Sequence, residues 1–210
     1  MNKLNEYWDN IHLKYNSTYD NWLNKYLSLI DKEDSIIELG CGRAYCSKYL
    51  LNNNYKNIIA CDFSEEVLKI IKKENPSLKI KLFDMSNGLP FKDNSINIII
   101  ADLCLHYFDS KTTKYMFDEI YRVLKKDGYL IARVNSCSDK NYIPKNSIQI
   151  EKNYYYDGTI YKKFFEEKDF NELFKKYEIH TLIQNKMTRY EKTKILWEFC
   201  IKKKKENKTQ

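Results

Sequence analysis

The sequence is poor in glycine and proline, with five and three residues among 210. We interpret this scarcity, which accompanies abundant lysine, asparagine, isoleucine and tyrosine, as a compositional bias without functional meaning. No stretch approaches the roughly 20 apolar residues of a membrane-spanning helix, and the polar start of the chain lacks the apolar core of a signal peptide. We therefore expect a soluble cytoplasmic protein without a membrane partner.

The six cysteines contain no C-x-x-C pair, and several lie inside apolar runs. A free thiol in such a run behaves as a small hydrophobic side chain. We therefore expect reduced thiols, as in a cytosolic protein, and no metal site.

A net charge of +7 invites a nucleic-acid interpretation, but most of it is terminal. The last residues, KKKKENKTQ, hold five lysines against Glu206 and contribute +4, which leaves +3 on residues 1–201. A short lysine run at a terminus is usually a solvated end. We therefore expect no nucleic-acid partner, and the oligomeric state cannot be inferred.

The apolar pattern alternates between strand-like and helix-like segments. Hydrophobic residues make up 43% of the chain, enough for one packed core. We expect strands at 35–39, 57–61, 78–84, 96–102 and 129–135, and helices at 20–31, 44–53, 64–74 and 111–126. Such alternation is typical of an α/β fold, a parallel sheet with helices on both faces.

The final third of the chain has a different pattern. A polar stretch at 136–163 is the strongest candidate for an insertion, and residues 166–177 are expected to form a helix. Segments 178–184 and 195–201 are apolar and have no convincing helix between them. We expect them to pair antiparallel at the edge of the sheet.

The segment IIELGCGRAYC places two glycines directly after a buried strand. The third glycine of the G-x-G-x-x-G fingerprint is missing, so a dinucleotide-binding loop is poorly matched. Glu38 would also oppose a pyrophosphate at the start of the following helix. A ligand that carries a positive group fits this segment better.

Two further acids follow strands in the next part of the chain. Asp62 ends the second strand, where it can accept hydrogen bonds from both hydroxyls of a ribose. Ser64 then has the position of a helix N-cap, with acidic residues in the first turn. Asp84 and Met85 end the third strand, where they could receive an amino-purine. The ligand pattern is thus an adenosine with a cationic, phosphate-free extension.

At this point the sequence resembles the class I S-adenosylmethionine-dependent methyltransferases. The resemblance rests on four ordered segments, ELGCG, ACDFSEEVL, LFDMSNGLPFKDNSINIIIADLCLHYF and EIYRVLKKDGYLI, and covers residues 33–135 most strongly. It implies a Rossmann-like, doubly wound sheet of about seven strands, mostly parallel with the last antiparallel. The cofactor implied is S-adenosyl-L-methionine, with S-adenosyl-L-homocysteine as product.

The resemblance also implies the residues that contact the cofactor. The methionine part would face Glu38, Leu39, Gly40, Cys41 and Gly42, with its amine held by the backbone carbonyls of Asp102 and Leu103. Asp62 would bind the ribose, and Phe63, Asp84 and Met85 the adenine. The family's third loop glycine is Ala44 here, which should crowd the loop.

The same resemblance divides the chain, as a single methyltransferase domain over 1–210, into five parts. These are N-terminal lid or packing helices at 1–32, a cofactor-binding core at 33–135, a substrate-side insertion at 136–165, a C-terminal helix and antiparallel strand pair at 166–201, and a basic tail at 202–210.

Methyl transfer needs little catalytic machinery, because the sulfonium methyl is already activated and the protein mainly aligns a nucleophile and excludes water. His106 matches a position close to the transferred methyl in relatives, and it is either a general base or a packing residue. Aromatic residues near the N-terminus, with Tyr15 and Tyr19 assigned to the cofactor, either form a lid with cation–π contacts or simply pack on the core. The acceptor side is assigned to Trp8, His12, Tyr107, Asn135, Glu151, Tyr154 and Arg189, although a surface turn explains Arg189 equally well.

Three functions remain in view. Residues 102–105 lack the Asn or Asp, two prolines and aromatic residue that hold a flipped base in amino-methylating relatives, so we favour a small-molecule acceptor with an O, N or S nucleophile. A protein-lysine methyltransferase is the alternative, and an open groove rather than a closed pocket would favour it. A non-catalytic interaction protein is the third, favoured by Ala44 and opposed by the three acids.

Overall fold

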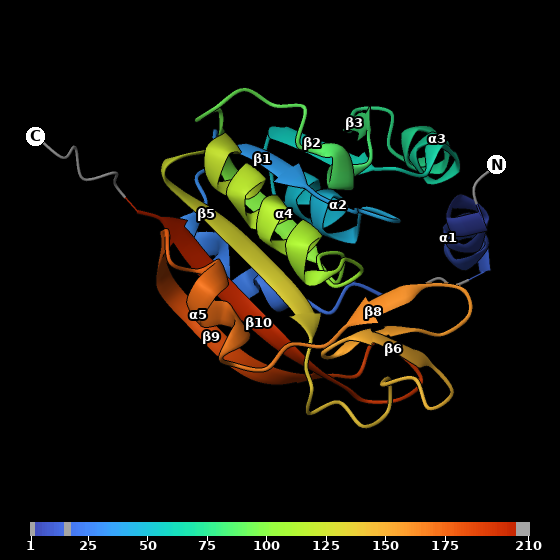
Figure 1. Cartoon of the computed structure of the whole chain (residues 1–210). Coiled ribbons are helices and arrows are strands. Elements are labelled where there is room, and N and C mark those ends of the chain that lie inside the picture. Colours follow the sequence, from blue (N-terminus) through green and yellow to red (C-terminus); the bar gives the residue numbers. More distant parts are fainter. Residues whose placement is uncertain (1–2, 15–17, 205–210) are drawn as a thin grey trace, which may run out of the picture.

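The computed structural model describes residues 3–14 and 18–204. A seven-stranded sheet in the order β3-β2-β1-β4-β5-β10-β9 forms its centre (Figure 1). The strands are β1 Ser35–Glu38, β2 Asn57–Asp62, β3 Lys79–Leu82, β4 Ile96–Asp102, β5 Leu124–Asn135, β9 Tyr177–Met187 and β10 Lys194–Lys203. All neighbours pair parallel except β10, which runs antiparallel to both β5 and β9. The expected α/β fold and the antiparallel C-terminal pair are confirmed.

Helices cover both faces of this sheet. They are α1 Lys3–Lys14, α2 Tyr45–Asn52, α3 Glu65–Glu74, α4 Ser110–Val123 and α5 Asp169–Leu173, with 3-10 helices η1 Trp22–Leu29 and η2 Met85–Asn87. Side chains from η1, α2 and α3 form one apolar cluster with the sheet, and side chains from α4 and α5 form another. The central strands read as continuous apolar runs because both of their faces are covered.

Two expected helices are wrong in type or length. Residues 20–31 form the 3-10 helix η1 rather than an α-helix. An apolar stripe shows which face is buried but does not distinguish the two hydrogen-bond patterns over so short a segment. The helix expected at 166–177 is only the five residues of α5. After α5 the chain makes a turn, and Tyr177 already begins β9.

Strand β5 is longer than the sequence pattern suggests. Helix α4 ends at Val123, and β5 begins at Leu124 rather than at residue 129. Leu124 pairs with Ile96, and the register then shifts before Ile98 pairs with Tyr129. The polar KKDG segment conceals this extension, because strand patterns are recognised by their apolar residues.

The expected insertion contains a second, three-stranded sheet. It consists of β6 Ile148–Glu151, β7 Tyr154–Tyr156 and β8 Tyr161–Lys163, paired antiparallel. Glu151 accepts hydrogen bonds from the Ser110 backbone N and Oγ at 2.6 and 2.8 Å, and the Tyr154 hydroxyl donates to the Tyr107 carbonyl at 3.2 Å. These contacts fix the small sheet to the segment that follows β4.

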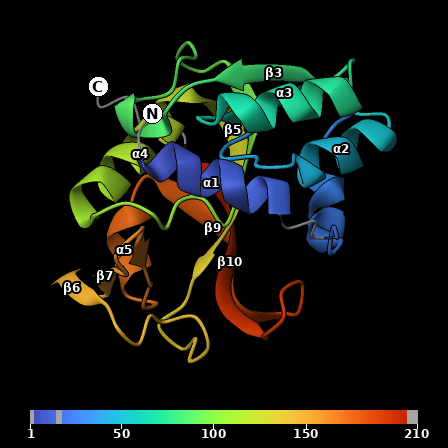
Figure 2. The same cartoon turned by 90° about the vertical axis from the view of Figure 1, so that its right-hand side faces the viewer.

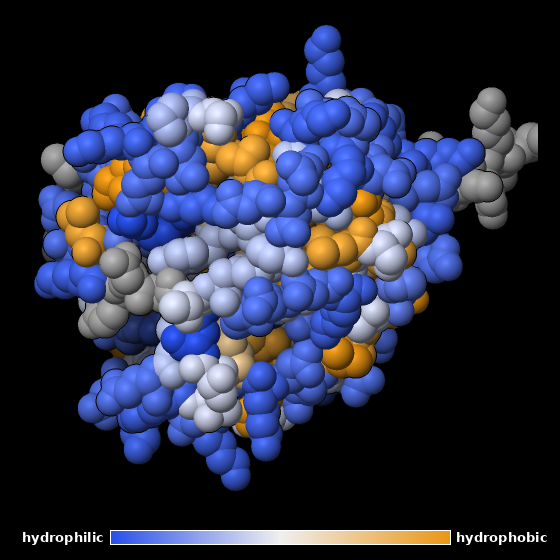
Figure 3. All heavy atoms as spheres, turned by 180° about the vertical axis from the view of Figure 1, so that it is seen from behind, coloured by the Kyte–Doolittle hydropathy of each residue, from blue (hydrophilic) through white to orange (hydrophobic). Residues whose placement is uncertain are grey.

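One face of the molecule shows how apolar residues are distributed on the surface. Viewed from behind, this face is largely hydrophilic, and its apolar residues lie in small separate patches (Figure 3). Within the described part of the chain, no helix has both the length and the apolar character needed to cross a membrane.

Candidate functional site

The glycine loop lies between the carboxyl end of β1 and the start of α2. Gly40, Gly42 and Ala44 all have positive φ values, of 53°, 49° and 54°. A Cβ at Gly40 would lie only 2.5 Å from the Cβ of Cys104, so the loop passes too close to the end of β4 for any larger residue. Ala44 adopts the left-handed backbone at a position where a glycine would be unstrained.

Glu38 is buried at the end of β1, with 3% of its surface exposed. Its Oε2 accepts hydrogen bonds from the Ser47 backbone N at 2.8 Å and from Ser47 Oγ at 2.5 Å, which ties the strand to α2. Burial raises the pKa of Glu38 to about 7, against the lowering effect of Ser47. The carboxyl is therefore poised to become fully ionised when a cation lies beside it.

Asp62, at the end of β2, holds the glycine loop from the other side. Its Oδ2 accepts from the Gly42 backbone N at 2.9 Å and its Oδ1 from the Ser64 backbone N at 3.0 Å. Burial raises the pKa of this carboxyl despite those hydrogen bonds. Ser64 caps α3 by accepting from Val67 N, as expected.

Helix α1 lies across the edge of the sheet where these strands end (Figure 2). His12 lies so close to Gly42 that a Cβ there would be 2.7 Å from its Cε1, and burial lowers the pKa of His12 against the opposing charges of Asp62 and Asp9. Ser64 Oγ donates to Asp9 Oδ1 at 2.5 Å. His12 was assigned to the acceptor, but its neighbours are the residues assigned to the cofactor.

The other residues assigned to the cofactor differ in exposure. Leu39 and Cys41 are buried beneath the loop, Phe63 is half-buried, and Met85 Cε would lie 3.3 Å from a Cβ at Gly40. Asp84 is exposed and caps η2 by accepting from Ser86 N and Oγ.

Of the two tyrosines assigned to the cofactor, only Tyr19 lies within the described residues. Tyr19 stacks on Tyr49 with ring centroids 4.5 Å apart, and its hydroxyl accepts from Leu23 N, so its observed contacts are those of a packing residue. Tyr15 lies outside the described residues.

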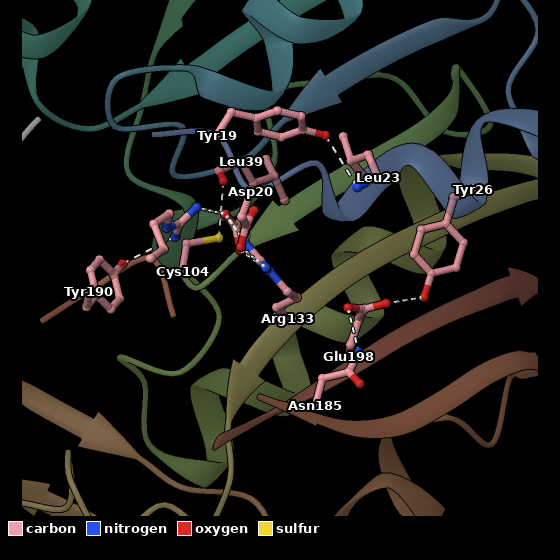
Figure 4. A network of polar contacts seen from close by, with 12 residues as sticks. Tyr19, Asp20, Leu23, Tyr26, Leu39, Cys104, Arg133, Asn185, Tyr190 and Glu198 are labelled. Atoms are coloured by element: carbon pink, nitrogen blue, oxygen red, sulfur yellow. Dashed lines mark hydrogen bonds and ion pairs between the residues drawn. The ribbon is translucent and has the colours of Figure 1, made fainter. Parts of the chain in front are cut away.

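An ion-pair network that we did not predict from the sequence surrounds the end of β4 (Figure 4). Asp102 pairs with Arg133 through Oδ1 to Nε at 2.7 Å and with Arg189 through Oδ2 to Nη1 at 2.9 Å. Arg133 also pairs with Asp20 at 2.7 Å and lies over the Trp22 ring. Burial alone would raise the pKa of Asp102, but the two arginines outweigh it and hold the pKa at about 2.

A signal for this network was present in the sequence. Arg133 is the one charged residue in the apolar run LIARVN, and a buried arginine needs an acidic partner. Leu103, next to Asp102, has a positive φ of 59°, and its backbone N donates to the Arg133 carbonyl at 3.0 Å.

The residues assigned to the acceptor come from helix α1, the segment after β4, the end of β5, the small sheet and the β9–β10 connection. His106 is 2% exposed, and its Nδ1 has no partner among the described residues. Asn135 is 1% exposed and donates through Nδ2 to the Lys163 carbonyl at 3.2 Å, while its Oδ1 is likewise unpartnered. The ring of Tyr107 contacts Trp8 of α1 edge to face at 4.9 Å. Glu151 and Tyr154 make the anchoring contacts of the small sheet described above.

The loop residues fit a cofactor that has a cationic, phosphate-free extension. Gly40 and Gly42 leave the backbone uncovered by side chains of their own, and two buried acids, Glu38 and Asp62, flank the loop. Those acids suit an ammonium or sulfonium group and ribose hydroxyls, and they disfavour phosphate.

Comparison with known sequences agrees with this geometry. Residues 37–132 match the family described as Methyltransferase domain. An uncharacterized methyltransferase of Schizosaccharomyces pombe is 31% identical over 109 residues, 52% of this chain and 41% of that protein. A tRNA N(3)-methylcytidine methyltransferase of Drosophila melanogaster is 29% identical, over 64% of this chain and 45% of that protein. An eEF1A lysine and N-terminal methyltransferase of Mus musculus is 26% identical, over 59% and 20%. The chain spans less than half the length of these curated relatives.

Solved structures share the fold at lower identity. A methyltransferase from Methanosarcina mazei has a TM-score of 0.76 and 19% identity, over 91% of this chain and all of that one. A Burkholderia thailandensis 1,6-didemethyltoxoflavin-N1-methyltransferase, with bound 1,6-didemethyltoxoflavin and S-adenosylhomocysteine, has a TM-score of 0.65 and 14% identity, over 87% and 75%. Residues 37–132 thus match a methyltransferase domain, and the strand order and the acid-flanked loop agree with the core of a class I S-adenosylmethionine-dependent methyltransferase.

Proposed function

We propose that this chain transfers the methyl group of S-adenosylmethionine to an O, N or S nucleophile on a small molecule. The burial of the acceptor-side polar groups carries this proposal. His106 after β4, Asn135 at the end of β5 and Lys194 at the start of β10 are at most 7% exposed. An acceptor that reaches them must enter the fold, which suits a small molecule better than a folded protein or an RNA helix.

The chain's own residues would orient and enclose the reactants. When bound, S-adenosylmethionine supplies an activated methyl group. Glu38 and Asp62 would hold its polar parts, while α1 excludes water from the strand ends through the contacts of His12 and Trp8.

His106 has the protonation state that a general base needs. Burial lowers the pKa of His106 well below its ordinary value, with the charges of Lys194 and Lys162 adding to the effect. The imidazole is therefore neutral at neutral pH, and its unpartnered Nδ1 can accept a proton from a bound nucleophile.

Two other catalytic functions are alternatives. The second candidate is a protein-lysine methyltransferase, and the third is a tRNA methyltransferase. Partial relatives carry both activities in their names. Either acceptor would need an opening wide enough for a macromolecule, and the enclosure of His106 and Asn135 disfavours that. A non-catalytic module is disfavoured because Glu38 and Asp62 keep buried carboxylates beside the glycine loop.

Calorimetric titration with S-adenosylmethionine, S-adenosylhomocysteine and NAD tests the cofactor assignment first. We expect the first two to bind saturably and NAD not to bind. Asp62→Ala should weaken binding by roughly tenfold or more, since a carboxylate that accepts hydrogen bonds is lost. Asp118→Ala, which removes an exposed carboxylate on α4, should leave binding unchanged. Absence of binding to folded wild-type protein would refute the proposal.

A further inference from the structure

Lys194 is a buried lysine with no acidic partner among the described residues. It begins β10, is 7% exposed and forms no ion pair with a described carboxylate. Its Nζ lies 4.5 Å from the centre of the Tyr142 ring, which offers only a cation–π contact. A buried ammonium without a counter-ion is costly, so its retention here needs an explanation.

The chain holds Lys194 in place through a turn of the preceding connection. Asp139 accepts hydrogen bonds from three backbone N–H groups, those of Asn141, Tyr142 and Ile195. Asn141 Nδ2 also donates to the Thr193 carbonyl at 2.7 Å. The carboxylate of Asp139 is thus committed to the backbone, and it attracts Lys194 only from a distance.

The surroundings of Lys194 are cationic. Burial, with the charges of Lys162 and Arg189 adding to its effect, lowers the pKa of Lys194 to about 8 against the opposing charge of Asp139. Lys162 has its own partner in Asp157, and Arg189 has Asp102. Of Lys162, Arg189 and Lys194, only Lys194 therefore forms no ion pair with a carboxylate of the described residues.

Two other buried groups in this cluster lack partners. Arg189 pairs with Asp102 through Nη1, but its Nε has no hydrogen-bond acceptor among the described residues. His106 Nδ1 is unpartnered, and the charge of Lys194 acts on its ring. Two neighbouring rings connect the two cations, since Tyr142, which Lys194 contacts, lies 6.1 Å from Tyr190, and the Arg189 guanidinium lies 5.3 Å from the Tyr190 ring. One cationic donor and one imidazole nitrogen are therefore unsatisfied near the ammonium of Lys194.

We propose that Lys194 and Arg189 bind an anionic group of the methyl acceptor, a carboxylate or a phosphate, beside His106. This inference rests on the proposed function and narrows it to acceptors that carry such a group. An anion between the two cations would satisfy Lys194 Nζ and Arg189 Nε together, and it would fix the nucleophile relative to His106.

The test uses protein saturated with S-adenosylhomocysteine, so that cofactor binding is established before the acceptor side is probed. This loaded protein is titrated calorimetrically with benzoate, with inorganic phosphate and with benzamide, the neutral counterpart of benzoate. We expect saturable binding of one or both anions and none of benzamide. Binding of benzoate alone identifies a carboxylate site, and binding of phosphate alone identifies a phosphate site.

Variants then locate the site. Lys194→Met keeps the length of the side chain, and we expect it to weaken anion binding about tenfold or more while S-adenosylhomocysteine affinity stays unchanged. Lys194→Arg should retain most of the binding. Lys202→Met, at the other end of β10 and paired with Asp127, is the matched control and should have no effect.

Three outcomes would overturn the inference. These are no binding of either anion to loaded wild-type protein, equal binding of benzoate and benzamide, and anion binding that Lys194→Met leaves intact. Weaker S-adenosylhomocysteine binding in Lys194→Met would show that the cofactor's own carboxylate uses this cation. Failure of the wild-type protein to bind S-adenosylhomocysteine would instead refute the proposed function.

Discussion

The residues proposed to bind the cofactor and those proposed to bind the acceptor form two halves of the site, and the two halves are built in different ways. The cofactor half lies in β1, β2 and the loops that directly follow them, so residues between 38 and 64 make most of its contacts with one another. The acceptor half joins the segment after β4, the end of β5, the small sheet and the β9–β10 connection. The first half can be predicted from the sequence because its residues are neighbours in the chain. The residues of the second half are far apart in the chain and come together only when the chain folds.

Arg133 joins the segment before η1, through Asp20, to the end of β4, through Asp102, and the loss of these ion pairs should have the largest effect on stability. Arg133→Met would leave Asp20 without its cation and the buried Asp102 with Arg189 alone. We expect a loss of about 3–5 kcal/mol in the free energy of unfolding, measured by urea denaturation. Lys56→Met removes an exposed pair with Glu33 and should cost less than about 1 kcal/mol. Equal losses in the two variants would contradict the bridging role of Arg133.

Close approach at the glycine loop can be separated from backbone strain. Gly40→Ala would place a Cβ 2.5 Å from Cys104 Cβ, whereas Gly158→Ala, also at positive φ, meets nothing within 4 Å. We expect Gly40→Ala to destabilise the fold by about 2–4 kcal/mol and Gly158→Ala by about 1 kcal/mol. Thermal unfolding of both variants checks this, and a similar shift in both would mean that strain alone matters.

The pH dependence of stability should reveal the buried Glu38. Its pKa of about 7 lies above the ordinary value of 4.5, so the folded state binds this proton more tightly than the unfolded state. The contribution is fully present below pH 4.5 and is lost as pH rises through 7, by on the order of 3 kcal/mol. Urea unfolding of wild type and Glu38→Gln between pH 4.5 and 7.5 measures it. The variant should lack this part of the decline, and an identical slope would refute the assignment.

Ala44→Gly should produce the smallest change. Glycine relieves the positive φ of Ala44, worth about 1–2 kcal/mol, but it removes a fully buried methyl group worth about 0.8 kcal/mol. We therefore expect a stability gain of no more than about 1 kcal/mol by thermal unfolding. A clear loss of stability would show that the methyl packs better than the backbone geometry implies.

The sequence predicted the strands and the helix cap around the glycine loop well because their signals are local. A glycine pair after an apolar strand, acids at strand ends and Ser64 as an N-cap each depend on a few neighbouring residues. It did not predict η1 as a 3-10 helix, because an apolar stripe over so short a segment fits either helix type, and it did not predict the small sheet, which has no distinctive apolar period. Lys194 and Asp20 were missed for another reason. Their significance comes from partners that lie far away in the chain, and no spacing rule connects them.

The double pairing of Arg133 also bears on how this chain folds and can be shortened. It joins residues 113 positions apart through Asp20 and 31 apart through Asp102, and Asp102 in turn reaches Arg189 over 87 positions. Closing such long loops costs conformational entropy and slows folding. The ion pairs offset this cost only when the segments that carry Asp20, Asp102 and Arg189 have all reached Arg133 or one another. The segment before β1 is therefore part of the cooperative fold. A chain shortened by removing residues 1–32 would lack Asp20, and the buried Arg133 would keep only Asp102 as an acidic partner.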